Sequence, residues 1–450
     1  MRLTRKNEMR SATSPRILCI SPLFAPMADS EAFCSAKMVA ALVKAGADVQ
    51  VLSCSNVVRE NPVCDASPSW QELEPLRIDL PTPAERSLWK SVYTGLHYQT
   101  SIYSRWVALV VQQARILHEQ RPFDFVYSRS LPMCAHIAGF WCAKKLALPW
   151  VANLNDPWEG QFLPEVAFPN LSMLDSATYK FWLKRTLQSA DLVTYPCDRL
   201  HAFHARVSGI DHDSAILPHV ARINDGAAAN GSLFHLLHAG KLGTSENPPR
   251  PAKPLLIALK NFLDANVDAR PITRFTLLGP ADEGTNQLVL DLGLQDIVSN
   301  TGRVSYEESL RVIAAATICV LVEAVVVEGI FLPSKLVDYL AAGKPVLAMS
   351  PENGTVTDLA AAHSSITKVG QHDPASIQTA IASLYRDFKT GPLSSRAPSS
   401  SLRRKFTSAQ VAKDFLAAAD TIVKSSHSRF SNIAASTEPV EHMQLASGVK

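Results

Sequence analysis

The chain has 450 residues, 47% of them hydrophobic and 19% charged, which is the composition of a packed globular protein with room for two or three domains. Its 44 basic and 41 acidic residues leave a net charge of +3, and no basic stripe of the kind that binds nucleic acid stands out. The composition therefore excludes disordered, collagen-like and disulfide-scaffold proteins, and it predicts no nucleic-acid partner.

Cysteine usage and hydropathy favour a cytoplasmic protein. The eight cysteines are scattered and none has C-x-x-C spacing, so we predict small buried residues in a reducing compartment rather than a metal site. No apolar segment follows the basic residues 1–14 before Ile17, so we expect no signal peptide. The longest apolar stretch, Ala314 to Val327, is shorter than a membrane span, which needs about 20 residues. Membrane contact is expected to be at most peripheral, on the inner face.

The first half of the chain alternates strands and helices. Residues 16–20 (RILCI) form a short apolar strand, 31–44 have helical spacing and stop before Gly46, and 49–53 (VQVLS) form a second strand. A strand, a helix and a strand within about 40 residues make a βαβ unit, and such units build parallel sheets. The same pattern recurs in the predicted strands 124–128, 150–154 and 191–195 and in the predicted helices 133–147 and 173–189.

The alternation restarts after a small, polar, glycine-bearing segment at 222–232, which is typical of a linker. The predicted strands of the second half are 234–239, 274–279, 316–323 and 345–350, and its predicted helices are 254–263 and 336–342. Residues 404–424 have the spacing of an amphipathic helix, and the Ser-rich residues after them predict a disordered tail.

The sequence thus predicts an α/β protein of two doubly wound, Rossmann-like parallel-sheet domains that face each other across a cleft. The predicted units are a basic tail at 1–14, domains at 15–222 and 223–395, a C-terminal helical segment at 396–424 and a tail at 425–450. Ligands of such sheets bind beyond the carboxyl ends of the strands, so we expect the binding and catalytic residues in the loops there.

The stretch 328–348, EGIFLPSKLVDYLAAGKPVLA, is the most informative of these loops. An acid, Glu328, precedes a helix whose free N-terminal amides, together with a lysine, are suited to binding a diphosphate. Asp338 lies one turn further on, where a carboxylate can accept hydrogen bonds from vicinal hydroxyls. An ordinary capped helix with solvated charges is the alternative. The residues assigned to the anion site are Leu332, Pro333, Ser334 and Lys335.

This stretch resembles the donor-binding signature of the family 4 retaining glycosyltransferases of the GT-B fold, E-G-F-G-L-P-x-x-E-A-x-A-x-G-x-P-V. The matching residues are Glu328, Gly329, Leu332, Pro333, Gly343, Pro345 and Val346. Residues 331–345 are closer still to a variant subgroup, F-L-P-S-K-L-x-E-Y-L-A-x-G-K-P. The resemblance implies that Glu328 contacts the transferred sugar and that Asp338 takes the place of the second acid. Because the spacing of the acids differs by two residues, Glu323 is a rival to Glu328.

A second segment, 238–259, resembles the family's strand-end G-R-L followed by a basic residue and a helix, where two cations hold the diphosphate. Lys241 falls on the arginine position, and Arg250 fits the second cation, with Lys253 as its rival. Two cations can neutralise the departing diphosphate without a metal, so no metal and no other cofactor is expected. Arg303 lies in a segment that resembles the loop meeting the nucleobase.

The N-terminal half resembles the family's acceptor domain. Residues 21–53 match its first loop and helix, although 27–30 (MADS) stand where the family has Gly-Gly. Asn155-Asp156 occupy the position of the family's catalytic-cleft H-D, so Asp156 is a candidate for orienting hydroxyl groups in catalysis. A turn or helix-cap role is the alternative for Asp156. His136, His219 and His238 have no metal-ligand spacing and are expected to be structural.

The resemblance implies transfer of a sugar with retention from a nucleotide sugar bound by the C-terminal half to a glycan or lipid-linked acceptor bound by the N-terminal half, in surface or extracellular polysaccharide synthesis. It also implies that the last helix packs back on the N-terminal domain. The aromatic and basic residues of 86–106 fit a membrane surface or an amphiphilic acceptor, although core packing is the favoured interpretation. Two alternatives remain, a non-catalytic scaffold of the same fold and a sugar-nucleotide epimerase, the latter disfavoured by Asn155.

Overall fold

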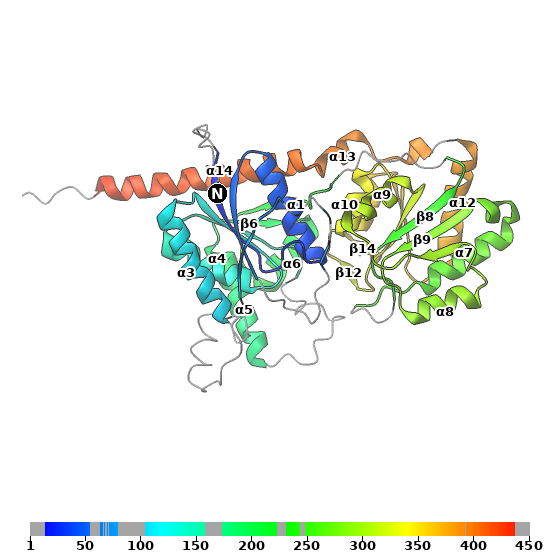
Figure 1. The fold of residues 1–450 in the computed structure, drawn as a ribbon, viewed down its shortest axis with the longest axis horizontal. Helices are drawn as coiled ribbons and strands as arrows, with labels where there is room; N and C mark the ends of the chain where they lie inside the picture. The colour runs from blue at the N-terminus through cyan, green and yellow to red at the C-terminus, as the bar shows by residue number, and fades with distance from the viewer. Residues whose placement is uncertain are drawn as a thin grey trace, which may run out of the picture.

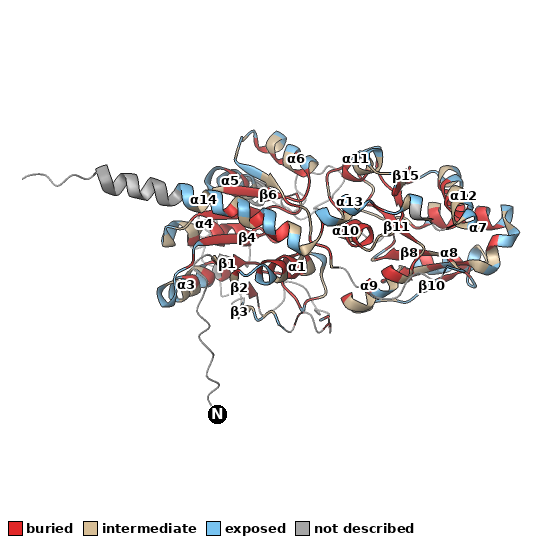
Figure 2. Ribbon diagram, turned by 90° about the horizontal axis from the view of Figure 1, so that it is seen from above, coloured by how far each residue is buried: buried red, intermediate tan, exposed pale blue. Residues whose placement is uncertain are grey.

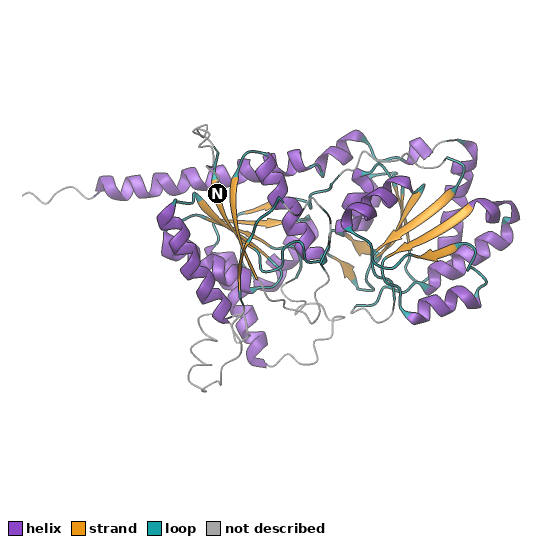
Figure 3. Ribbon diagram, viewed as in Figure 1, coloured by secondary structure: helices purple, strands orange, loops and turns teal. Residues whose placement is uncertain are grey.

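The computed structural model describes residues 14–54, 64–65, 67, 70, 72–79, 104–157, 173–222, 231–243, 248–391 and 393–436. These residues form two α/β halves side by side, each with a parallel sheet covered by helices, as Figures 1 and 3 show. The two predicted doubly wound sheets are therefore confirmed.

The N-terminal sheet has the strand order β3-β2-β1-β4-β5-β6-β7, and every pairing in it is parallel. Its central strands are buried along their whole length, which explains why they read as continuous apolar runs. The strands are β1 (Arg16–Ile20), β2 (Asp48–Cys54), β3 (Leu76–Ile78), β4 (Phe125–Arg129), β5 (Trp150–Asn153), β6 (Leu192–Tyr195) and β7 (Ser214–Ile216). The helices are α1 (Ser30–Lys44), α3 (Ser104–Gln120), α4 (Cys134–Leu146), α5 (Met173–Ser189) and α6 (Asp198–Ser208).

The C-terminal sheet has the order β10-β9-β8-β11-β13-β15, also parallel throughout. Its strands are β8 (Phe234–Ala239), β9 (Thr273–Leu278), β10 (Val298–Asn300), β11 (Ile318–Val322), β13 (Val346–Met349) and β15 (Ile366–Val369). A small separate pair is formed by β12 (Glu328–Gly329) and β14 (Asn353–Gly354). The helices are α7 (Lys253–Ala265), α8 (Glu283–Asp291), α9 (Tyr306–Ala315), α10 (Ser334–Ala341), α11 (Thr355–Ala362) and α12 (Pro374–Thr390), with short 3-10 turns at Val267–Ile272 and Leu393–Arg396.

The end of the chain differs from the predicted single helix over 404–424. The helical segment is divided into α13 (Ser400–Lys405) and α14 (Ser408–Ser436), and α14 continues past residue 425, where we had placed the start of a disordered tail. No Gly or Pro interrupts 425–436, so nothing in the local sequence stops the helix there. Residues 437–450 lie outside the described residues. The helix packs against α1, and the Phe415 ring lies 4.6 Å from that of Tyr127, so α14 returns to the N-terminal half (Figure 1).

The hydrophobic core crosses the boundary between the halves. One cluster contains buried residues of the central strands of the N-terminal sheet together with buried residues of C-terminal elements, while a second lies within the C-terminal half. Figure 2 shows the buried strands between helices whose outer faces are exposed. Seven of the eight cysteines are buried, Cys64 is exposed, and none forms a disulfide. Within the described residues, no helix has the length and apolarity needed to cross a bilayer.

Candidate functional site

The ends of β8 and the start of α10 bring two of the predicted cations together. Gly240, which follows β8, has φ +119°, and a Cβ atom built there would lie 1.8 Å from the Nζ atom of Lys335. Only glycine combines that backbone conformation with room for the lysine. Lys335 lies in the first turn of α10, which begins after Pro333, so its ammonium group lies against the loop that carries Lys241. Lys241 is exposed beside it.

Arg250, the other predicted cation, is fixed by its backbone. Its N–H and carbonyl pair with those of Gly243 at 3.0 and 2.9 Å, and the carbonyl of Pro249 accepts a hydrogen bond from the Val325 N–H at 3.0 Å. These bonds hold the segment before α7 next to the loop after β11. The three predicted cations therefore lie at the carboxyl ends of neighbouring strands, where a parallel sheet binds its ligand.

Glu323 is the acid at the end of β11. It is buried, and burial raises the pKa of Glu323 to about 7, although Ser350 and Arg250 oppose the shift. Among the described residues, its Oε2 atom has no hydrogen-bond partner. A buried acid beside an arginine, with one unsatisfied oxygen, is a group that a ligand hydroxyl can satisfy.

His238 lies buried in β8, next to the loop that carries Lys241, and has a structural role. Its Nδ1 atom is 3.0 Å from the Val320 carbonyl, and burial, with Lys335 as the next cause, lowers the pKa of His238 to about 3. The ring is therefore neutral at ordinary pH, consistent with the structural role predicted for it.

Asp156 lies in the loop after β5 of the N-terminal half, near an acid that the sequence did not reveal. Glu31, in the first turn of α1, accepts a hydrogen bond at 3.0 Å from the side-chain amide of Asn155, the residue before Asp156, and both acids are partly buried. Burial raises the pKa of both groups, and repulsion by Asp156 adds to the rise at Glu31. Arg250 acts in the opposite direction on Asp156. Arg250 is thus near enough to influence both Asp156 and Glu323, and it links the acids of the two halves.

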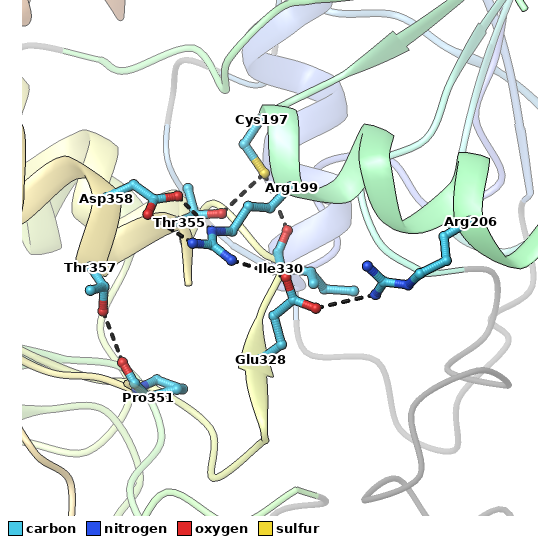
Figure 4. Close-up of polar contacts among 9 residues, drawn as sticks. All are labelled: Cys197, Arg199, Arg206, Glu328, Ile330, Pro351, Thr355, Thr357 and Asp358. Carbon is cyan, nitrogen blue, oxygen red and sulfur yellow. Dashed lines mark hydrogen bonds and ion pairs between the residues drawn. The ribbon is translucent and has the colours of Figure 1, made fainter. Parts of the chain in front are cut away.

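Glu328 belongs to a different cluster, which Figure 4 shows. Its carboxylate accepts hydrogen bonds from Arg199 at 3.0 Å and from Arg206 at 3.2 Å, both on α6 of the N-terminal half. Arg199 also pairs with Asp358 of α11 at 2.5 and 2.8 Å. We call these four residues the α6 cluster. The structure therefore places Glu328 in an ionic contact between the halves and does not bring it together with Asp156 and Arg250.

Asp338 also contacts the other half of the chain. Lys37 of α1 donates to its two oxygens at 3.3 and 3.4 Å, and the Tyr306 hydroxyl donates to both at 3.3 Å. Burial raises the pKa of Asp338, with Lys37 opposing. At Lys37 burial lowers the pKa, but Asp338, Tyr306 and Cys34 together outweigh it and the pKa is raised. In this arrangement the carboxylate is fully engaged within the protein, so a bound ribose would have to displace Lys37 or Tyr306. The predicted ribose contact stays a prediction.

The remaining predicted residues line the boundary between the halves. Arg303 is exposed and donates from Nη1 to the Ala28 carbonyl at 3.2 Å, so it contacts the loop that stands in place of Gly-Gly. Leu332 is buried, and Ser334 is partly buried at the start of α10. Within the described part of the chain, no group of three or more His, Cys, Asp or Glu side chains is arranged to hold a metal ion.

Comparison with known proteins agrees with the fold described above. Residues 32–218 match the sequence model of a family described as a glycosyl transferase 4-like domain, and no curated protein matches the chain. Sucrose-phosphate synthase from Thermosynechococcus elongatus has a TM-score of 0.63 and 15% identity, over 91% of this chain and 100% of that one. Anabaena HepE in complex with UDP has a TM-score of 0.63 and 13% identity, over 90% and 100%. The chain has the GT-B fold, and its residues 32–218 are similar to a glycosyl transferase 4-like domain.

The GT-B fold is shared by proteins with other activities. A UDP-N-acetylglucosamine 2-epimerase has a TM-score of 0.51 and 11% identity, over 90% of this chain and 95% of that one. At such low sequence identity, structural similarity establishes the fold alone. The reaction has to be inferred from the residues of the site.

In this GT-B chain, the groups that the sequence did not reveal are those that lie near the predicted acids. Lys37 occurs among the apolar positions Phe33, Met38 and Ala41 of its helix, and a lysine on a buried face signals an acidic partner. Glu31 gave no such signal, because one acid in a first turn is usual at a helix N-terminus. Arg199 and Arg206 lie in a segment for which we predicted no element.

Proposed function

We propose that this GT-B protein is a retaining glycosyltransferase, which transfers a sugar from a nucleotide sugar to a hydroxyl group of a glycan or lipid-linked acceptor in surface or extracellular polysaccharide synthesis. The observation that carries the proposal is the convergence of Lys241, Arg250 and Lys335 on one side of the cleft, opposite Asp156. HepE, which has the same fold, has been solved with UDP and with UDP-glucose.

The cations supply the main catalytic effect in this proposal. Negative charge grows on the nucleoside diphosphate as the bond to the sugar breaks, and fixed cations stabilise that charge more in the transition state than in the ground state. Lys335 adds its charge at the N-terminus of α10, where the free amides also favour an anion. Retention follows if a phosphate oxygen of the leaving group accepts the proton of the attacking hydroxyl on the same face of the sugar.

The acid that contacts the transferred sugar is Glu323 in this proposal. Glu323 is buried beside Arg250 with one oxygen unsatisfied, whereas two arginines already neutralise Glu328. Kinetics distinguish the two acids. Glu323→Gln should lower kcat at least about tenfold while Glu328→Gln leaves it nearly unchanged, because only a contact that strengthens in the transition state affects kcat. The reverse result would restore Glu328 to the sugar site.

The phosphate site is tested by binding. A thermal-shift screen of UDP-, GDP-, ADP- and CMP-sugars identifies the donor, and calorimetry then measures nucleoside-diphosphate affinity. Lys241→Ala and Arg250→Ala should each weaken binding by about 1.5–3 kcal/mol, the value of a charge-assisted contact. Lys260→Ala is the matched control, since Lys260 pairs with Asp264 on the surface of α7. Unchanged affinity in both test variants would exclude the assigned phosphate site.

The reaction is tested by product analysis. Purified protein with the identified donor and a crude extract of glycan and lipid-linked acceptors should give a labelled acceptor product, and we expect activity to persist in EDTA because the cations of the chain replace a metal. Complete loss in EDTA that magnesium restores would show a metal requirement. Binding without any transfer would favour a non-catalytic scaffold.

An epimerase is the second candidate, and the Glu31–Asp156 pair favours it, because epimerisation needs an acid and a base in the cleft. Incubation of the nucleotide sugar alone in D₂O separates the two reactions. An epimerase incorporates deuterium at a sugar carbon without an acceptor, whereas a glycosyltransferase leaves the donor unlabelled.

A further inference from the structure

One surface of the N-terminal half carries several basic side chains around an exposed phenylalanine. It is formed by the C-terminal end of α4 and the outer side of α5, two helices that pack against each other (Figure 1). Lys180 and Lys184 lie one turn apart on α5, as do Phe181 and Arg185, so these four side chains share one side of the helix. We call the exposed residues of this surface the α4–α5 face: Lys144, Lys145, Lys180, Phe181, Lys184 and Arg185.

The ring of Phe140 on α4 joins the two helices at this face. The central guanidinium carbon of Arg185 lies 4.9 Å from the centroid of the Phe140 ring, and the Nζ atom of Lys144 lies 5.9 Å from the same centroid. Lys144 is also 5.7 Å from the ring centroid of Trp141. Because cations of both helices meet over one ring, the α4–α5 face is a continuous basic surface and not two separate sets of charges.

The cations of the α4–α5 face lack acidic partners. Within the part of the chain that the structure describes, no carboxylate forms an ion pair with any of the five, whereas exposed cations of other helices have one, such as Arg115 with Glu119 on α3. The Phe181 side chain at their centre is 51% exposed. Five uncompensated charges are a strong local excess in a chain whose net charge is +3. The face therefore has the charge of a surface that binds an anionic partner.

This composition fits a lipid surface better than a protein partner. Lysine is depleted at protein–protein interfaces, whereas anionic lipid headgroups attract clusters of lysine and arginine. An aromatic ring can enter the boundary between headgroups and acyl chains, while the long stems of the surrounding lysines lie along apolar surface and keep their ammonium groups in water. One ring together with a basic cluster gives reversible binding that salt weakens.

We propose that the α4–α5 face docks the protein on the surface of an anionic lipid bilayer, with Phe181 inserted among the headgroups and the five cations around it. The inference goes beyond the proposed function and does not depend on it. It also gives the membrane contact expected from the sequence a different place. Residues 86–103 lie outside the described residues, and Trp106, the last aromatic residue of that segment, is buried.

Co-sedimentation of the full-length protein with vesicles tests the proposal. The protein should bind vesicles of phosphatidylglycerol and phosphatidylcholine in equal parts at least about tenfold more tightly than vesicles of phosphatidylcholine alone, and high salt should release it. Lys180→Gln combined with Lys184→Gln should weaken binding to the anionic vesicles by about 25-fold, since each charge near such a surface contributes about fivefold. Phe181→Ser should weaken it at least about fivefold, because the inserted ring is lost.

Lys405→Gln combined with Lys413→Gln is the matched control, since it removes the same net charge from exposed positions of α13 and α14. The control should bind like the wild type, and every variant should keep the wild-type thermal stability. The proposal is overturned if the wild type does not bind anionic vesicles, or if test and control variants lose affinity equally. Wild-type affinity in Phe181→Ser overturns it in favour of a soluble acidic partner. Specific vesicle binding by a protein that transfers no sugar supports the α4–α5 face and rejects only the proposed function.

Discussion

Among the described residues, two ionic contacts join the halves of this GT-B chain, and they lie in opposite surroundings. The Lys37–Asp338 pair is almost excluded from water, with side-chain exposures of 2% and 9%. In the α6 cluster, the exposures of Arg199, Arg206, Glu328 and Asp358 range from 27% to 60%. Each contact contains an acid, Asp338 or Glu328, that we assigned to the donor site from the sequence.

The difference in burial gives the two contacts different consequences. Breaking one side of a buried pair leaves a charge without water or counter-charge, which is costly, whereas water and salt screen an exposed pair. Around Lys37, the rings of Phe33, Trp70 and Tyr306 also pack with centroids 5.2–5.6 Å apart, so apolar burial adds to the ion pair. We therefore expect the buried contact to fix how the halves sit and the α6 cluster to break at little cost when they move apart.

Removing the buried acid is the strongest test of the comparison. Asp338→Ala should lower the free energy of unfolding by about 3–5 kcal/mol, because Lys37 is left buried with its charge uncompensated. Denaturant unfolding measures the loss, and adding Lys37→Met should recover much of it. Asp264→Ala, at an exposed acid on α7, is the control.

The alternative role of Asp338 gives a different result. If the carboxylate binds the ribose of the donor, Asp338→Asn should raise KM for the donor more than it lowers kcat. A loss of stability under about 1 kcal/mol in Asp338→Ala, together with such a KM effect, would contradict the buried contact.

Glu323 sharpens the comparison, because it is an acid at which the effect of burial exceeds the opposing charge of Arg250. Its pKa of about 7 is above the ordinary value of 4.5, so the folded protein binds this proton more tightly than the unfolded chain does. The free energy of unfolding should therefore fall as pH rises from about 4.5 through 7, by about 3 kcal/mol in total, and then level off. Subtracting the pH profile of Glu323→Gln from that of the wild type isolates this contribution. A flat difference would mean that Glu323 is solvated.

Breaking the α6 cluster should change the free energy of unfolding least. Glu328→Gln is expected to cost less than about 1 kcal/mol at low salt, and high salt should remove even that difference because exposed pairs are screened. Unfolding in low and high salt tests both statements. If Glu328→Gln lowers the free energy of unfolding more than Asp338→Ala does, the α6 cluster stabilises the protein more than the buried pair, contrary to this prediction.

The sequence by itself determined the fold class and most of the elements of both sheets. The central strands β1, β4, β8 and β11 are mostly apolar, since both faces of a parallel sheet are covered by helices. Short edge strands such as β3 and β10 were missed, because three partly exposed residues leave no distinctive pattern. The segments that carry Lys241, Arg250 and Lys335 were also placed beyond strand ends from the sequence, because loops that follow strands can be recognised locally.

Only the tertiary structure decided the partners of the acids. Asp338 and Glu328 looked equally available in the sequence, yet each meets a basic residue more than a hundred positions away, on the other half of the chain. Glu31, which the sequence did not single out, likewise accepts a hydrogen bond from Asn155, the residue before Asp156 and more than a hundred positions away. Local patterns specify which residues form a strand or a loop, but the packing of one domain on the other sets which charges meet and how much water screens them. Burial and long-range pairing therefore determine what each carboxylate of this protein can do.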